Sequence, residues 1–170
     1  ERDRWRRFFT TNPQALEAAV HPGGRFATVG KLIDHIFLVE RRHLQRLRRE
    51  PLAVQTGLTG NNAPPLFDYG ASVRRELEGL VEGLDEDEAN EIRTFEVREQ
   101  QWPMTPRKLL FHILLHELRH WAQIALAARQ GNRLAKQLKM NFCRALAAQR
   151  EQQVNWTLKQ TCHDIRTDGE

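Results

Sequence analysis

Three histidines repeat at four-residue intervals within a helix-forming stretch, and this repeat constrains the fold more than any other feature. The stretch, residues 105–132, reads TPRKLLFHILLHELRHWAQIALAARQGN, and its histidines are His112, His116 and His120. Residues four apart lie on one helical face, about one turn apart. Pro106 suits the first turn, where its missing N–H costs nothing, and Gly131 closes the helix. We therefore predict a long helix in which two imidazoles can reach one metal ion.

Apolar residues form a broad stripe along the same stretch, which predicts that the helix is buried. They are Leu109, Leu110, Ile113, Leu114, Leu118, Trp121, Ile124, Ala125 and Ala128. A single histidine on such a face is usually a hydrogen-bonded core residue. Burying three histidines in register costs desolvation free energy, which metal coordination would offset. Neutral imidazole is a common ligand for zinc, nickel, copper and iron. The repeat favours a metal site, with hydrogen-bonded core histidines as the alternative.

The same residues fit the H-E-x-x-H pattern of zinc peptidases, in which two histidines bind zinc and the glutamate activates water. In this chain those residues are His116, Glu117 and His120. The longer metzincin pattern is excluded, because Gln123 and Leu126 stand where it requires glycine and histidine. A zinc peptidase of the shorter pattern remains an alternative.

Two features of the sequence weigh against the peptidase. No acidic residue lies between His120 and Glu151 to supply a third ligand. Glu117 is also one residue from His116, so it points about 100° away around the helix. We expect its carboxylate at an edge of the helix packing, close to Arg119 and Lys108.

Composition describes one globular domain of ordinary size. The 170 residues include 28% charged and 40% hydrophobic residues, with a net charge of +4. This charge permits an anionic partner without requiring one. No apolar run approaches about 18 residues, so we expect no membrane-spanning helix. Cys143 and Cys162 do not make a disulfide framework, and we expect a reducing cytoplasm.

The first fifty residues predict a partial helix, a turn and a short second helix over residues 4–20, followed by a long helix over residues 29–49. Thr28 is expected to cap the long helix. Within it His35 lies among apolar residues and should face the core, whereas His43 follows two arginines and is expected to be exposed. His35 is therefore the better third ligand.

The middle of the chain alternates loops with helical spacing. Residues 51–65 predict a loop that is long for a helical protein and therefore mobile or functional. Residues 66–84 resume helical spacing, and the acidic run 85–88 is expected to be a solvated connector. Residues 92–102 predict a short strand or an extended cover over the helices.

The last part of the chain, residues 135–170, predicts a basic helical extension that is either packed or partly disordered after Arg150. Apolar residues recur every four positions, from the last residue before this extension onward: Leu134, Leu138, Phe142 and Leu146. They predict an amphipathic helix that lies on the preceding domain, residues 1–134, or on a partner subunit. A nucleic-acid-binding strip that includes Lys136, Lys139 and Arg144 is the alternative.

Three pieces of the chain, in order, resemble the DinB family, also called DinB/YfiT-like metalloproteins. They are the LIDHIFLVERRHLQRL helix, the long loop with the helix after it, and HILLHELRHWAQIALAARQGN. The resemblance covers residues 4–134. It implies an all-α, four-helix, up-down-down-up bundle with a long crossover loop, and frequent homodimers. It also implies one divalent metal per chain, zinc or nickel, with His35, His116 and His120 as ligands.

The resemblance leaves other residues of the same helix as candidates for supporting the ligands or for catalysis. They are His112, Glu117 and Gln123. Some relatives are metal-dependent thiol transferases or isomerases that use a low-molecular-weight thiol. Three protein ligands leave an open coordination position, which is typical of a catalytic site. We expect an S-transferase, isomerase or hydrolase that acts on a small molecule.

Two functional alternatives stay open, a metal-binding stress-response protein without turnover and a nucleic-acid- or protein-binding helical module. Neither cysteine has a ligand-like context, so a thiol would come from a cosubstrate and would react with an electrophilic small molecule. The apolar residues of the extension need burial, which predicts a homodimer.

Overall fold

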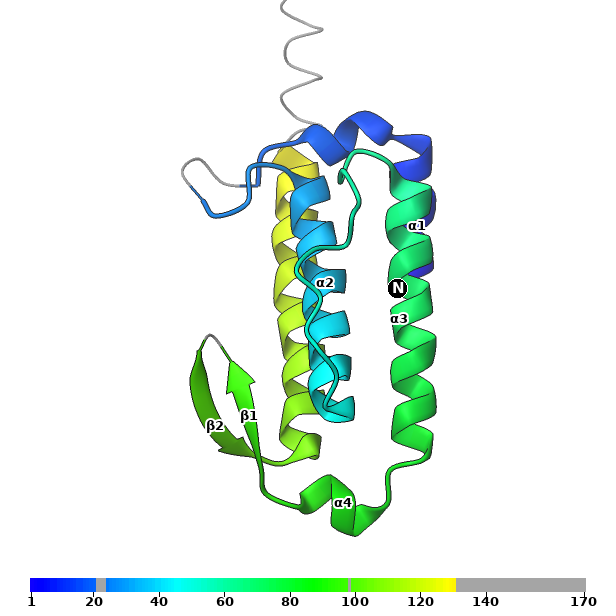
Figure 1. Cartoon of the computed structure of the whole chain (residues 1–170). Coiled ribbons are helices and arrows are strands. Elements are labelled where there is room, and N and C mark those ends of the chain that lie inside the picture. The colour runs from blue at the N-terminus through cyan, green and yellow to red at the C-terminus, as the bar shows by residue number, and fades with distance from the viewer. Residues whose placement is uncertain (21–23, 98, 131–170) are drawn as a thin grey trace, which may run out of the picture. The chain divides into compact units, whose positions relative to one another are not determined.

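Three long helices lie side by side and carry most of the buried apolar residues (Figure 1). The computed structural model describes residues 1–20, 24–97 and 99–130. Its long helices are α2 (Val29–Arg48), α3 (Ala63–Glu82) and the helix of residues 106–130, here called the histidine helix. At the amino-terminal end, α1 (Arg2–Thr11) contacts α3, and the 3-10 helix η1 (Pro13–Glu17) contacts α2. The described chain is mostly helical, as predicted.

The connection between α2 and α3 returns along the molecule, so that these two helices run in the same direction (Figure 1). The Thr28 side chain accepts a hydrogen bond from the Lys31 N–H and begins α2, which confirms the predicted cap. Arg49 ends α2 in the left-handed conformation, with φ of 58°. The histidine helix then runs opposite to α2.

The prediction for the start of α3 was wrong by one turn. This helix begins at Ala63, so that Pro64 and Pro65 lie inside its first turn instead of ending the loop. Prolines are tolerated there, because the first N–H groups of a helix have no partner within the helix. Because α2 ends at Arg48, the connecting loop covers residues 49–62 and is only one residue shorter than the predicted loop of residues 51–65.

Two short elements join α3 to the histidine helix. The acidic run predicted as a connector forms a short helix, α4 (Glu86–Asn90), because the Asp85 carboxylate accepts a hydrogen bond from the Glu88 N–H. The segment predicted as a strand or cover is an antiparallel hairpin of β1 (Arg93–Val97) and β2 (Gln100–Met104). Its position beside the histidine helix brings residues from the hairpin to the site described below (Figure 1).

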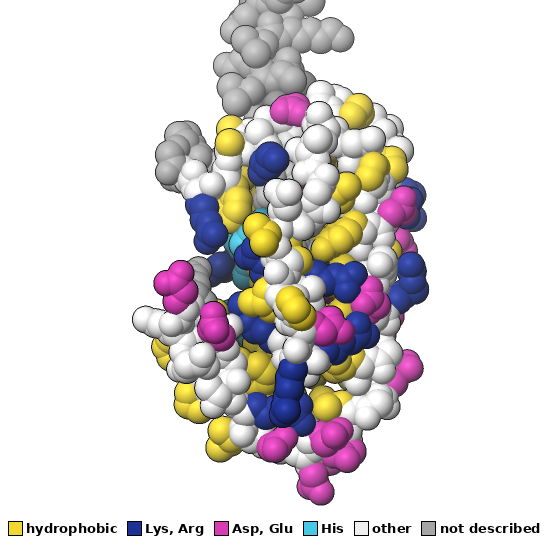
Figure 2. All heavy atoms as spheres, viewed as in Figure 1, with side chains coloured by type: hydrophobic (Ala, Val, Ile, Leu, Met, Phe, Trp, Pro, Cys, Tyr) yellow, Lys and Arg dark blue, Asp and Glu magenta, His cyan; other side chains and the backbone are white. Residues whose placement is uncertain are grey.

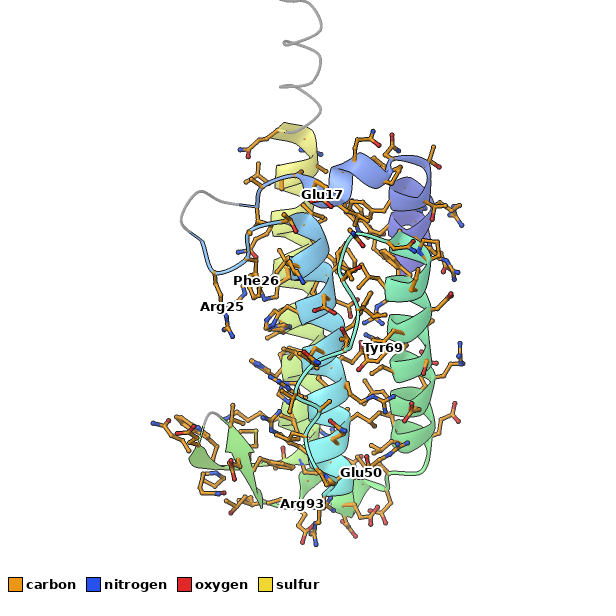
Figure 3. All side chains as sticks on the ribbon, turned by 45° about the horizontal axis from the view of Figure 1, so that its top comes forward. Glu17, Arg25, Phe26, Glu50, Tyr69 and Arg93 are labelled. Carbon is orange, nitrogen blue, oxygen red and sulfur yellow. The ribbon has the colours of Figure 1, made fainter. Side chains whose placement is uncertain are left out.

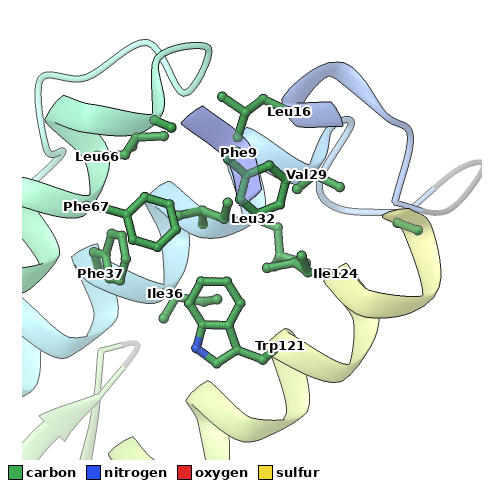
Figure 4. Packing of buried hydrophobic residues seen from close by; sticks show 13 residues of the cluster. Phe9, Leu16, Val29, Leu32, Ile36, Phe37, Leu66, Phe67, Trp121 and Ile124 are labelled. Carbon is green, nitrogen blue, oxygen red and sulfur yellow. The ribbon is translucent and has the colours of Figure 1, made fainter. Parts of the chain in front are cut away.

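The larger apolar cluster joins the amino-terminal elements to the three long helices (Figure 4). Its largest members are aromatic: Phe9, Phe37, Phe67 and Trp121. The Trp121 indole stacks on Phe67 with ring centroids 6.2 Å apart and on Trp5 at 5.5 Å. Offset aromatic packing of this kind adds to the burial of apolar area. One face of the histidine helix is thereby fixed against the core.

A close backbone approach holds the loop against α2. A β-carbon added at Gly30 would lie 1.7 Å from the carbonyl oxygen of Gly60, whose φ of +80° favours glycine. We expect Gly30→Ala to destabilise the protein by about 2–3 kcal/mol, because backbone atoms must move apart. Gly79→Ala is the control, since its added carbon meets nothing within 4 Å. Urea unfolding measures both, and equal effects would contradict this packing.

Within the described residues, the helices are too short or too polar to cross a membrane. Residues 1–129 form one compact unit. The predicted boundary at residue 134, the extension 135–170 and its candidates Lys136, Lys139 and Arg144 lie outside the described residues.

Candidate metal centre

Three imidazoles from two helices meet at one point. His35 comes from α2, and His116 and His120 come from successive turns of the histidine helix. The Nε2 atom of His116 lies 3.2 Å from Nε2 of His35 and 3.1 Å from Nε2 of His120. One ligand atom from each histidine lies within 4.8 Å of the other two. The three residues therefore form a group that could hold a metal ion.

The spacing of these nitrogen atoms fits a single ion. Zinc-to-nitrogen bonds of about 2.0–2.1 Å at tetrahedral angles place two ligand nitrogens about 3.3 Å apart. The observed separations of 3.1 and 3.2 Å are close to this value. Three neutral nitrogen donors suit zinc and nickel.

Gln123 fixes the orientation of one of the three histidines. The Nδ1–H of His120 donates a hydrogen bond of 2.7 Å to the Gln123 side-chain oxygen. This bond places the proton on Nδ1 and leaves the Nε2 lone pair directed at the other two histidines. Gln123 sits three residues after His120, so both side chains share one helical face.

The histidines are held in their neutral form. Burial is the main cause that lowers the pKa of His35 to about 4, and repulsion from protonated His120 and from nearby arginines adds to it. Burial and the charges of the other two histidines lower the pKa of His116 to about 3. Burial also lowers the pKa of His120, against the opposing hydrogen bond to Gln123. Neutral imidazole is the form that binds a metal.

These low pKa values predict metal binding that persists in acid. Between pH 7 and 5.5, three histidines of ordinary pKa would lose about 600-fold in metal affinity to protonation. Because His35 and His116 have pKa values of about 4 and 3, they stay neutral throughout this range. We expect the zinc affinity of the protein to fall only a few fold. Chelator competition measures it, after correction for the protonation of the chelator itself. A loss of several hundredfold would show that the histidines titrate normally.

A cavity of about 600 Å³ opens over the three histidines. Its walls include Val39 of α2 and, from the hairpin, Val97, Gln100 and Trp102. Figure 2 shows histidine side chains recessed in a hollow beside the hairpin, with Lys and Arg side chains around it. Phe26 covers His35, with ring centroids 4.5 Å apart, from the segment before α2 (Figure 3). The cavity admits a small molecule to one side of the histidine group.

Two further histidines line the cavity outside this group. His112 is exposed, and its ring centroid lies 6.1 Å from that of His116 and 5.5 Å from that of His43. His43 is only 4% exposed, so the prediction of an exposed residue was wrong. It packs against His112 beneath the hairpin, a contact that its flanking arginines did not indicate. Burial lowers the pKa of His43 to about 3.

Glu117 points away from the histidine group into a buried ion-pair cluster. Its two carboxylate oxygens each accept a 2.6 Å hydrogen bond, one from Arg2 and one from Arg74. Trp121 donates a third bond of 2.9 Å. Burial would raise the pKa of Glu117, but these partners lower it to about 2.

Arg2 and Arg74 take the place of the arginine and lysine of the histidine helix that we expected beside Glu117. They come from α1 and α3, which helical spacing within one segment does not reveal. A carboxylate engaged in this way is not placed to activate water at the histidines. The geometry therefore gives no support to the peptidase alternative.

The arginines of the cavity were not recognised in the sequence as part of a site. Arg42 and Arg46 lie on α2 at spacings of seven and eleven residues from His35, so they share its helical face. This spacing could have identified Arg42 and Arg46 from the sequence as neighbours of His35. Arg25 and Arg119 line the cavity as well, and no pattern in the sequence pointed to them.

The family model of the DinB superfamily matches residues 1–124. This match includes all three histidines of the group and covers more than two thirds of the chain. The chain belongs to the DinB superfamily, which confirms the family predicted from the sequence. No curated protein matches the chain.

Proposed function

We propose that His35, His116 and His120 bind one divalent ion, zinc or nickel, and that the protein is a metal-dependent enzyme acting on a small molecule. The convergence of three Nε2 atoms at the base of an open cavity carries this proposal. Three protein ligands leave a coordination position for water or substrate, whereas structural zinc usually has four.

The chemistry we propose is transfer of a thiol to an electrophile, with isomerisation or hydrolysis as related reactions. A divalent ion in this position supplies positive charge that lowers the pKa of a thiol or water beside it. The chain itself holds the three imidazoles neutral, orients His120 through Gln123 and surrounds the open side with a walled cavity. We take the thiol to be a cosubstrate, because neither Cys143 nor Cys162 has a ligand-like context in the sequence.

Elemental analysis followed by an activity panel tests this function. We expect about one zinc or nickel per chain in purified protein, and turnover of thiol and electrophile pairs that stops on chelation and returns on reloading. His120→Ala should lose metal and turnover together. Turnover that is unchanged after metal removal would reject the proposal of a metal-dependent enzyme.

We also propose that α1, α2, α3 and the histidine helix form the up-down-down-up bundle of the family, with residues 49–62 as its long crossover. The shared direction of α2 and α3 and the opposite direction of the histidine helix support this topology. The His35 side of α2 then faces the histidine helix along the site.

We propose that the protein is a homodimer whose interface includes an exposed apolar stripe on the histidine helix. Its large side chains are half or more exposed: Phe111, Leu114, Leu115, Leu118 and Leu126. Burying each is worth about 1.5–3 kcal/mol. Their spacing of three and four residues is that of a helix pairing with a like helix. A second copy presents the same stripe across a two-fold axis.

Sedimentation of single variants tests this interface. At micromolar concentration we expect the full chain to be a dimer and Leu118→Glu to be a monomer, because the added charge would be buried. Ile92→Glu is the control, since Ile92 is also exposed but lies beside the hairpin. A Leu118→Glu dimer would move the interface elsewhere, including to residues 135–170.

A further inference from the structure

Four arginines surround the cavity above the three histidines, and no acidic residue lines it within the described part of the chain. They are Arg25, Arg42, Arg46 and Arg119. Among residues 1–20, 24–97 and 99–130, none of the four forms an ion pair with a carboxylate. Positive charge therefore collects at the cavity, and the nearby charge of Glu96 acts on Arg46 without forming an ion pair with it.

Several arginines elsewhere on the long helices are paired with carboxylates. Arg41 and Arg48 of α2 both bind Glu76, with nitrogen-to-oxygen distances of 2.8 and 2.9 Å. Arg74 of α3 binds two glutamates. Further arginines also form no ion pair with a carboxylate within the described residues, but none of them lines the cavity: Arg4, Arg7, Arg49, Arg75 and Arg129.

Backbone carbonyl groups hold two of the four cavity arginines in place without removing their charge. Arg42 donates 2.7 Å hydrogen bonds to the carbonyl oxygens of Ala53 and Val54. Arg46 donates a 2.6 Å bond to the carbonyl oxygen of Glu96. A carbonyl is a neutral acceptor, so each guanidinium is oriented and still charged.

The other two arginines approach the histidine group directly. A terminal nitrogen of Arg119 lies 3.5 Å from Nε2 of His120. Arg25 lies over the ring of Phe26, 5.5 Å from its centroid, and that ring packs on His35. A group bound by Arg119 would therefore lie within a few ångströms of an ion held by the histidines.

We propose that the cavity binds a small molecule carrying carboxylate or phosphate groups, which the arginines hold beside the histidine group. This inference rests on the proposed function for the position of the reacting group, but the recognition of the anion does not require the metal. Three neutral imidazoles leave the full charge of a divalent ion uncompensated, and the arginines add to it. An anionic ligand offsets both, and guanidinium groups bind carboxylate and phosphate with well-defined geometry.

Paired ligands that differ in charge test the proposal by calorimetry. For zinc-loaded protein the probes are mercaptosuccinate and thioglycerol, which share a thiol and differ in their carboxylates. We expect mercaptosuccinate to bind at least about tenfold more tightly at low salt. Equal affinities would overturn the proposal while leaving the metal centre intact.

Variants assign the effect to the cavity. Arg119→Gln, at an exposed position, should weaken mercaptosuccinate about tenfold and leave thioglycerol within about twofold. Arg48→Gln is the matched control on α2 and should change neither. An equal loss for both thiols in Arg119→Gln would show that Arg119 does not recognise charge, and would overturn its role.

Metal-free protein separates this proposal from the proposed function. Succinate and inorganic phosphate should each bind more tightly than neutral succinamide, and the tighter of the two identifies the anionic group as carboxylate or phosphate. If zinc does not bind at all, the proposed metal-dependent function is rejected. The comparison of these ligands on metal-free protein still tests whether the cavity binds anions. Binding of neither anion above succinamide would overturn the anion site.

Discussion

Replacing His116 with alanine should lower zinc affinity by more than about a hundredfold. The free energy of zinc binding to structural sites is about 10–16 kcal/mol for four ligands, or roughly 3 kcal/mol per ligand. Each 1.4 kcal/mol of binding free energy corresponds to about a tenfold change in affinity. His116 is the central member of the group, because its Nε2 lies 3.1 and 3.2 Å from those of the other two. Chelator competition at pH 7 measures the change.

His112→Ala is the matched control for this experiment. His112 lies one turn before His116 on the same helix and lines the same cavity, but it is outside the group of converging nitrogens. We expect less than about a threefold change in zinc affinity. A larger loss in His112→Ala than in His116→Ala would assign the metal to the His43 and His112 pair instead.

Replacing Glu40 with alanine should destabilise the fold by about 3–5 kcal/mol. The Glu40 side chain is 2% exposed and accepts 2.6 Å hydrogen bonds from Arg2 and Arg74. These two arginines also share Glu117, so two positive and two negative groups form one closed cluster. Removing one carboxylate leaves two largely buried guanidinium groups with a single counterion.

Glu76→Ala is the control for the ion-pair cluster. Glu76 also binds two arginines, Arg41 and Arg48, but its side chain is 34% exposed. Solvent screens such pairs, and we expect a cost of at most about 1 kcal/mol. Urea unfolding of both variants compares the two sites, and a Glu40→Ala cost no larger than that of Glu76→Ala would show that the cluster contributes little.

Local sequence patterns predicted the features that depend on neighbours along one helix. The four-residue spacing of His116 and His120 fixed their shared face, and apolar neighbours identified His35 as the residue that faces them. The Thr28 cap followed from the residue type that satisfies a free helix N–H. Each of these inferences needs only helix geometry.

Features that depend on distant segments were predicted poorly. Glu117 pairs with Arg2, 115 residues away, so its neighbours along the histidine helix gave the wrong environment. His43 is buried by the hairpin and His112, although arginines precede it in the sequence. In both cases the tertiary partner outweighs the local composition.

Nine apolar residues of the histidine helix were predicted to be buried, and two of them are exposed. Leu109, Ile113, Trp121 and Ile124 are buried, whereas Leu114 and Leu118 are exposed. Hydrophobic spacing identifies faces that avoid water but does not say whether the same chain or another copy covers them. The homodimer therefore stays a prediction.

X-ray absorption at the zinc edge, on protein loaded with one equivalent of zinc, tests the metal centre most directly. We expect three imidazole nitrogens at about 2.0–2.1 Å with one further light atom at the open position. His35→Ala and His120→Ala should each reduce the imidazole count. Sulfur ligands, or fewer than two imidazoles in the unaltered chain, would contradict a centre built from His35, His116 and His120.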